Sequence, residues 1–212
     1  IGLGIPAEPL FRSRDEILAL IDDRESEVRL TGLMDGSKQG DSVTRYLFSL
    51  LGVKTIFETK GEGIPQTITI KKNGRCVPRL EYDFVNSPDL AQTFVVVCAA
   101  KNIPFHFTGL STLKIKETDR IEALKKEMRK LGYVIHDFND SELKWDGERC
   151  EPSYEEGIDT YEDHRMALAF APYALKIGQL KINHPQVVSK SYPRYWDDLV
   201  KAGFQIEEGQ KE

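Results

Sequence analysis

The chain has 212 residues, of which 40% are hydrophobic and 30% are charged, and its formal net charge is −5. This length suffices for one substantial domain, and the mildly acidic composition excludes a basic nucleic-acid-binding arm. No apolar run approaches the roughly 20 residues that span a bilayer, so we expect no membrane segment. The three cysteines, Cys76, Cys98 and Cys150, form no CxxC pair, which favours a reduced, cytoplasmic setting.

The first residues show no signal peptide, because they lack a basic region followed by a long apolar region. They also lack an initiator Met. We therefore expect a piece of a longer protein, in which residues 1–14 stay unassigned and residues 15–212 form one domain.

Three stretches of the sequence share one plan at a spacing of 74 residues. Asp15, Asp89 and Asp163 each stand at the head of an apolar helical run. A short alternating segment, typical of a strand, follows each run, at Val28–Leu33, Phe105–Leu110 and Leu180–Asn183.

Each repeat then continues into an amphipathic helix, as the apolar spacings from Val43 and from Ile121 indicate. Glycines suited to a helix C-terminus follow, at Gly52, Gly132 and Gly203. Further strands are predicted at Val53–Glu58, Tyr133–Phe138 and Phe204–Glu207, and the first two repeats add strands at Thr67–Lys71 and Leu143–Trp145, with turns at Asn73-Gly74 and Asp146-Gly147. The pattern predicts an α/β domain of three βαβ-type repeats.

Basic residues recur where predicted helices begin, although the partial positive charge of a helix N-terminus disfavours them there. They are Lys38, Lys116, Arg120, Arg165, Lys190 and Arg194. Cations that recur in phase would build a pocket for a small anion. The alternative is a set of ordinary surface charges, paired with neighbours such as Asp119 or Glu117.

Two carboxylates, Asp89 and Glu117, lie among these cations and could accept or deliver a proton. The alternative is that Asp89 is an ordinary helix cap and Glu117 an ordinary loop acid. No Cys/His cluster or HExxH motif predicts a metal site, and no glycine-rich phosphate loop predicts a nucleotide cofactor. We therefore expect neither a metal nor a cofactor.

Four segments, in this order, resemble motifs of the 5-enolpyruvylshikimate-3-phosphate synthase family. They are Ser37-Lys38-Gln39-Gly40-Asp41, Leu113-Lys114-Ile115-Lys116-Glu117-Thr118-Asp119-Arg120-Ile121, Tyr161-Glu162-Asp163-His164-Arg165-Met166-Ala167 and Lys190-Ser191-Tyr192-Pro193. The resemblance implies one half of the two-domain inside-out α/β barrel of the enolpyruvyl transferases, in a monomeric enzyme. It also implies transfer of the enolpyruvyl group of phosphoenolpyruvate to the 5-hydroxyl of shikimate 3-phosphate, with release of phosphate.

By the same resemblance, Asp89 is the proton acceptor and Glu117 the proton donor. Asp89 and Lys116 contact shikimate 3-phosphate, while Arg120, Arg165 and Lys190 bind phosphoenolpyruvate. The family's other domain is absent from this sequence, so we expect the chain to be inactive alone. Two alternatives stay open: a UDP-N-acetylglucosamine enolpyruvyl transferase, and a non-catalytic anion-binding module of the same fold.

Overall fold

The computed structural model describes residues 7–21, 26–34, 41–58, 65–116, 118–207 and 209. The elements of the first repeat are α1 (Ala7–Leu20), β1 (Glu27–Met34), α2 (Asp41–Leu50), β2 (Leu51–Phe57) and β3 (Pro65–Cys76). The second repeat holds β4 (Leu80–Asp83), η1 (Pro88–Leu90), α3 (Ala91–Ala100), β5 (Phe105–Thr108), η2 (Ser111–Ile115), α4 (Arg120–Lys130), β6 (His136–Phe138) and β7 (Glu142–Trp145). The third holds η3 (Tyr154–Glu156), α5 (His164–Phe170), η4 (Ala171–Tyr173), α6 (Ala174–Ile177), η5 (Pro185–Lys190) and α7 (Tyr195–Lys201).

Two sheets carry the same strand plan, which confirms the predicted repeat. In the first sheet, of order β1-β3-β2, both outer strands pair antiparallel with β3 and therefore run parallel to each other. In the second sheet, of order β4-β5-β7-β6, strands β5 and β6 flank β7 in the same way, and β4 adds a parallel strand beside β5. Each unit is thus a βαβ crossover whose third strand inserts between the two parallel ones.

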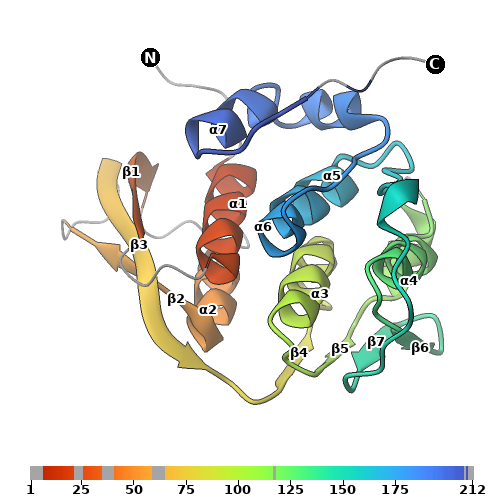
Figure 1. The fold of residues 1–212 in the computed structure, drawn as a ribbon. Helices are drawn as coiled ribbons and strands as arrows, with labels where there is room; N and C mark the ends of the chain where they lie inside the picture. The colour runs from red at the N-terminus through yellow and green to blue at the C-terminus, as the bar shows by residue number, and fades with distance from the viewer. Residues whose placement is uncertain are drawn as a thin grey trace.

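Three helices, α1, α3 and α5, contact one another in the middle of the molecule, between the two sheets, and α7 covers one end (Figure 1). Nine of the ten residues of α3 are buried, including the apolar run from Phe94 to Ala99. A chain of aromatic contacts runs from α2 across α3 into the second sheet, through Phe48, Phe94, Phe84 and Phe107. One continuous core therefore supports the elements that carry the predicted site.

Most of the predicted elements are confirmed, but the third repeat differs from the prediction. The segment Leu180–Asn183 makes only a single bridge, between Ile182 and Ile158, and Phe204–Glu207 forms no strand. A strand needs a neighbour for its backbone hydrogen bonds, and the described part of the third repeat holds no counterpart of β3 or β7.

The predicted turn at Asn73-Gly74 is also wrong, because these residues lie within β3. The pairing with β2 jumps there from Leu51–Cys76 to Val53–Lys72, which is a bulge. Gly74 has a φ of +70°, and an irregular strand segment accommodates this backbone as well as a turn does.

The helix ends agree with the prediction at Gly52, Gly132 and Gly203, whose φ angles are +95°, +88° and +100°. The predicted start at Asp15 is wrong, since α1 begins at Ala7 and Asp15 lies buried within it. None of the helices in the described ranges is long and apolar enough to cross a membrane.

Candidate functional site

Asp89 is the point at which three of the predicted cations meet. Its Oδ1 lies 2.6 Å from Arg120 Nη1 and 3.7 Å from Lys116 Nζ, and its Oδ2 lies 3.2 Å from Arg165 Nη2. Asp89 belongs to η1, Lys116 follows η2, Arg120 opens α4, and Arg165 is the second residue of α5. Four elements from two repeats thus bring these charges together, as an anion pocket requires.

The electrostatics of this cluster keep Asp89 ionised. Burial alone would raise the pKa of Asp89, but the charges of Arg165, Arg120 and Lys116, together with the hydrogen bond from Arg120, outweigh burial and lower that pKa. An ionised carboxylate can accept a proton. The same cations, when a phosphate or carboxylate ligand approaches, supply positive charge that Asp89 only partly neutralises.

Asp163 holds Arg120 from the other side. Its Oδ2 lies 2.6 Å from Arg120 Nε and 3.4 Å from Gln92 Nε2, and its Oδ1 accepts a hydrogen bond from the backbone N–H of Arg165 at 2.9 Å. The side chains of Asp163 and Arg120 are 0% and 2% exposed. The guanidinium of Arg120 is therefore fixed between two carboxylates before any ligand arrives.

Asp163 stands at the head of α5, as its sequence context predicts, but the sequence pattern did not predict that Asp163 is the buried counterion of Arg120. The repeat could have indicated this role, because Asp163 stands at the position equivalent to Asp89 and Asp89 lies among the predicted cations. The alternative of ordinary surface pairing fails for Arg120. The nearby Asp119 caps α4 instead, where its Oδ1 accepts a hydrogen bond from the backbone N–H of Glu122.

The remaining predicted site residues lie at the edge of this arrangement or outside the described residues. Lys190 is exposed at the end of η5, and its Nζ donates to the backbone carbonyl of Glu162 at 3.5 Å. Lys190 is thus tied to the segment that leads into Asp163. Glu117 and Lys38 lie outside the described residues.

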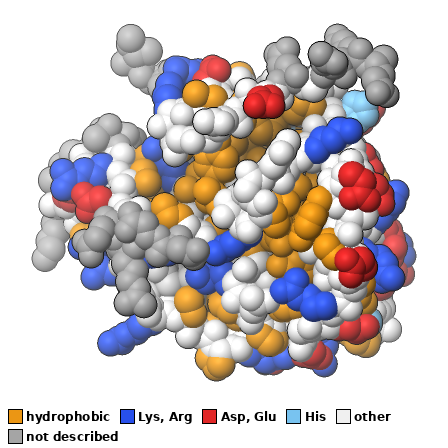
Figure 2. Space-filling model, viewed as in Figure 1, with side chains coloured by type: hydrophobic (Ala, Val, Ile, Leu, Met, Phe, Trp, Pro, Cys, Tyr) orange, Lys and Arg blue, Asp and Glu red, His pale blue; other side chains and the backbone are white. Residues whose placement is uncertain are grey.

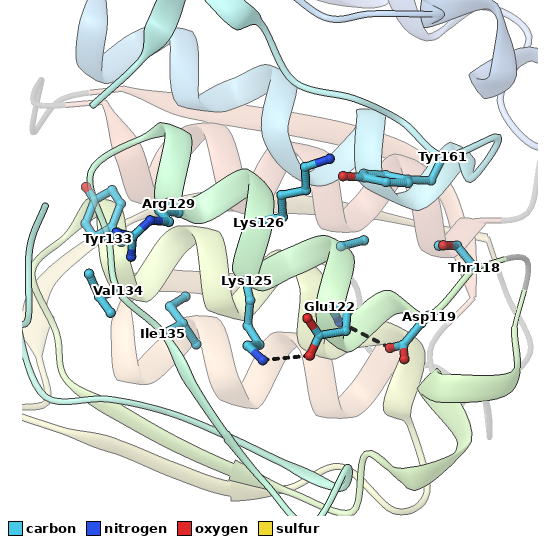
Figure 3. A pocket seen from close by; sticks show the side chains of 11 residues that line it. Thr118, Asp119, Glu122, Lys125, Lys126, Arg129, Tyr133, Val134, Ile135 and Tyr161 are labelled. Carbon is cyan, nitrogen blue, oxygen red and sulfur yellow. Dashed lines mark hydrogen bonds and ion pairs between the residues drawn. The ribbon is translucent and has the colours of Figure 1, made fainter. Parts of the chain in front are cut away.

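A cavity of about 420 Å³ is lined by residues of α4 that do not belong to this cluster, among them Glu122, Lys126 and Arg129 (Figure 3). Its described lining includes Thr118 and Asp119 from the predicted motif, but not Asp89, Lys116, Arg120 or Arg165. The cation cluster therefore does not line this cavity, and the side chain of its Arg120 is buried. Among the described residues, no group of three or more His, Cys, Asp or Glu side chains could hold a metal ion.

Charges of both signs are interspersed over the face drawn in Figure 2, where Lys and Arg form separate small groups around a middle rich in hydrophobic side chains. A nucleic acid requires a continuous basic surface, and this face does not offer one. Fold and site together define an α/β repeat domain in which three basic side chains surround an ionised carboxylate.

Comparison with known proteins identifies the family. A model of the EPSP synthase (3-phosphoshikimate 1-carboxyvinyltransferase) family matches residues 17–199, so the chain belongs to that family. A 3-phosphoshikimate 1-carboxyvinyltransferase of Bacteroides fragilis is 59% identical over 187 residues, which are 88% of this chain and 44% of that protein. One from Methanosphaerula palustris is 31% identical over 196 residues, or 92% and 43%.

The solved structure of EPSP synthase from Acinetobacter baumannii matches with a TM-score of 0.69 and 16% identity, over 95% of this chain and 47% of the other. This confirms the predicted fold, one domain of the enolpyruvyl transferase architecture. The chain spans less than half the length of the relatives it matches.

Proposed function

We propose that this chain supplies half of the active site of a 3-phosphoshikimate 1-carboxyvinyltransferase. The enzyme would transfer the enolpyruvyl group of phosphoenolpyruvate to the 5-hydroxyl of shikimate 3-phosphate and release phosphate. The observation that carries this proposal is the contact of Asp89 with Lys116, Arg120 and Arg165, in a chain of the EPSP synthase family. Both substrates are anions, which accounts for a cationic site in an acidic chain.

The proposed roles follow from charge and protonation. Arg120, Arg165 and Lys190 bind phosphoenolpyruvate, whose phosphate leaves in the reaction, and Lys116 binds shikimate 3-phosphate. Asp89 contacts the same substrate and is ionised, so it can take the proton of the attacking hydroxyl as the new C–O bond forms. Glu117 gives a proton to the methylene carbon of phosphoenolpyruvate. Glu117 then takes a proton back from that carbon as the bond to phosphate breaks and the double bond is restored, and the proton held by Asp89 leaves with the phosphate.

We further propose that the other domain of the enzyme supplies the remaining contacts and closes on the substrates, so that this chain alone is inactive. The complete enzyme would act as a cytoplasmic monomer without metal or cofactor. The match to the EPSP synthase family, rather than the site itself, favours this function over a non-catalytic anion-binding module and over a UDP-N-acetylglucosamine enolpyruvyl transferase.

The test uses a fusion of this chain to the missing half of the Bacteroides fragilis relative. We expect the fusion to release phosphate from phosphoenolpyruvate only when shikimate 3-phosphate is present, and the chain alone to release none. Asp89→Asn and Glu117→Gln should lower kcat at least about a hundredfold. Glu122→Gln, on the exposed face of α4, is the matched control and should leave kcat unchanged. A folded fusion that releases no phosphate, beside an active relative, would contradict the proposal.

A further inference from the structure

The loop over residues 157–163 is attached to α4 at two points, at the start of the helix and near its end, where Glu127 and Lys130 both bind it, and only the first point lies in the site described above. At the first point, Arg120 binds Asp163. At the second, Glu127 lies two helical turns further along the same buried face of α4 and binds the loop at Asp159 and Tyr161. We propose that Glu127 is a positioning residue. Through its hydrogen bond with Tyr161, it fixes the positions of Asp163 and Arg165 and preserves the contact of Lys190 with this loop. The effect on catalysis rests on the proposed function.

Glu127 is fully buried and is surrounded by donors. Its Oε1 accepts a hydrogen bond from the Tyr161 hydroxyl at 2.6 Å, and its Oε2 accepts one from the backbone N–H of Asp159 at 3.0 Å. Lys130 Nζ lies 2.7 Å from the same Oε2 and also binds Asp159 Oδ2 and the carbonyl of Gly157. A carboxylate satisfies all these donors, whereas a glutamine amide would turn an NH₂ group toward one of them.

Tyr161 is fixed at both ends of its side chain. Burial, followed by the hydrogen bond to Glu127, raises the pKa of the Tyr161 hydroxyl, so this group stays protonated and donates. Lys126 Nζ lies 5.9 Å from the centre of the ring. Figure 3 shows the hydroxyl directed toward α4, with Lys126 beside it. The side chain thus ties the loop to the helix.

The backbone at this point needs such a restraint. Tyr161 and Glu162 have φ angles of +53° and +56°, and a left-handed conformation is unfavourable for a residue other than glycine. Two such residues in succession persist only where surrounding contacts determine them. Glu127, which lies on α4, makes the contact that stabilises this conformation of the loop.

The left-handed pair sets the orientation of the residues that follow. It directs the Glu162 carbonyl to Lys190 Nζ and places Asp163 where its carboxylate both caps α5 at Arg165 and binds Arg120. All three proposed phosphoenolpyruvate ligands are therefore connected to this one turn. Its relaxation would disturb the binding of phosphoenolpyruvate more than that of shikimate 3-phosphate.

The experiment has two arms and uses Glu127→Gln, Tyr161→Phe and their combination, with Glu122→Gln as the control on the same helix. In the fusion enzyme, we expect each variant to raise the KM for phosphoenolpyruvate about tenfold, with the KM for shikimate 3-phosphate unchanged. The double variant should lose no more than the larger single loss, since both act through one hydrogen bond. Tyr161→Phe keeps the ring and removes only the hydroxyl, so it tests the idea even where Glu127→Gln fails to fold.

The second arm follows the Nε–H resonance of Arg120 by NMR in the chain itself, because this group donates directly to Asp163. Tyr161→Phe should shift the resonance, and Glu122→Gln should not. A lowered unfolding temperature with an unmoved resonance and an unchanged KM would overturn the positioning role. An inactive fusion whose Arg120 resonance still responds to Tyr161→Phe would instead refute the proposed function alone.

Discussion

Arg120 Nε and Asp163 Oδ2 lie 2.6 Å apart in a place where neither side chain meets solvent. A buried ion pair contributes little net stability while it is intact, but removal of one partner leaves an uncompensated buried charge. Here the pair connects the first residue of α4 to the cap of α5, so its loss would affect both helices of the site.

We expect Asp163→Asn to destabilise the chain by about 3 kcal/mol, because Arg120 then keeps Asp89 as its single described carboxylate partner in this cluster. Urea unfolding followed by circular dichroism measures the change. Asp146→Asn is the control, since it breaks the exposed pairs of Asp146 with Arg79 and Lys144 and should have a much smaller effect. Equal losses in the two variants would contradict the assignment of Asp163 as the buried counterion.

Asp89 competes with any anion for Arg120, Arg165 and Lys116. Asp89→Asn should therefore tighten the binding of inorganic phosphate to this chain about tenfold, equivalent to roughly 1.4 kcal/mol, while it lowers kcat in the fusion. Calorimetric titration at low salt measures the affinity. Asp137→Asn removes a carboxylate that pairs with Lys125 instead and should leave phosphate affinity unchanged. Weaker binding in Asp89→Asn would show that phosphate does not enter this cluster.

Because of Asp15, the free energy of unfolding should depend on pH with a sign opposite to that produced by a carboxylate in an ion pair. Burial raises the pKa of Asp15 well above its usual range, and neither carboxylate oxygen has a hydrogen-bond partner among the described residues. The folded chain therefore keeps a proton that the unfolded chain releases near the usual Asp pKa of about 3.9. As the pH rises from there toward the folded-state pKa, the free energy of unfolding falls.

Asp15→Asn cannot ionise, so its unfolding free energy should exceed that of the parent by a margin that grows as the pH rises from about 4 toward the folded-state pKa of Asp15. Urea titrations at several pH values measure this margin. Asp198→Asn supplies the opposite case, because Lys201 and Tyr192 outweigh burial and lower the pKa of Asp198. A margin for Asp15→Asn that does not depend on pH would contradict the buried, protonated carboxyl.

Gly109, which follows β5, illustrates a close approach that a side chain would block. Its φ is +73°, and a Cβ there would lie 2.2 Å from Asp83 Oδ1 and 2.4 Å from the backbone N of Val85. Gly178 has a similar φ of +83° but open space around it. We expect Gly178→Ala to cost about 1–2 kcal/mol and Gly109→Ala at least about 2 kcal/mol more, as thermal or urea unfolding would show. Similar losses of unfolding free energy in the two variants would indicate that the loop at Val85 moves aside at little energetic cost.

The repeat, in which basic residues recur in phase, predicted that cations would gather in one place, and the structure brings three of them to Asp89. Local patterns in the sequence predicted the repeats and most strands. They succeeded because helix periodicity, strand alternation and C-terminal glycines act within a few residues of each other. The same patterns failed where a tertiary contact decides. Asp163 finds Arg120 across 43 residues, and Tyr161 and Glu162 adopt positive φ angles without being glycines. The bulge at Asn73-Gly74 likewise depends on pairing with β2, which turn propensity does not report.

The position of β3 in its sheet has a consequence for the order of assembly during synthesis. Among the described strands, β3 is the one that pairs with both β1 and β2, and β7 stands in the same relation to β5 and β6. Each of these central strands is the last of its repeat to leave the ribosome. We therefore expect each sheet to remain open until its repeat is complete, and the chain to acquire structure in discrete steps, one repeat at a time.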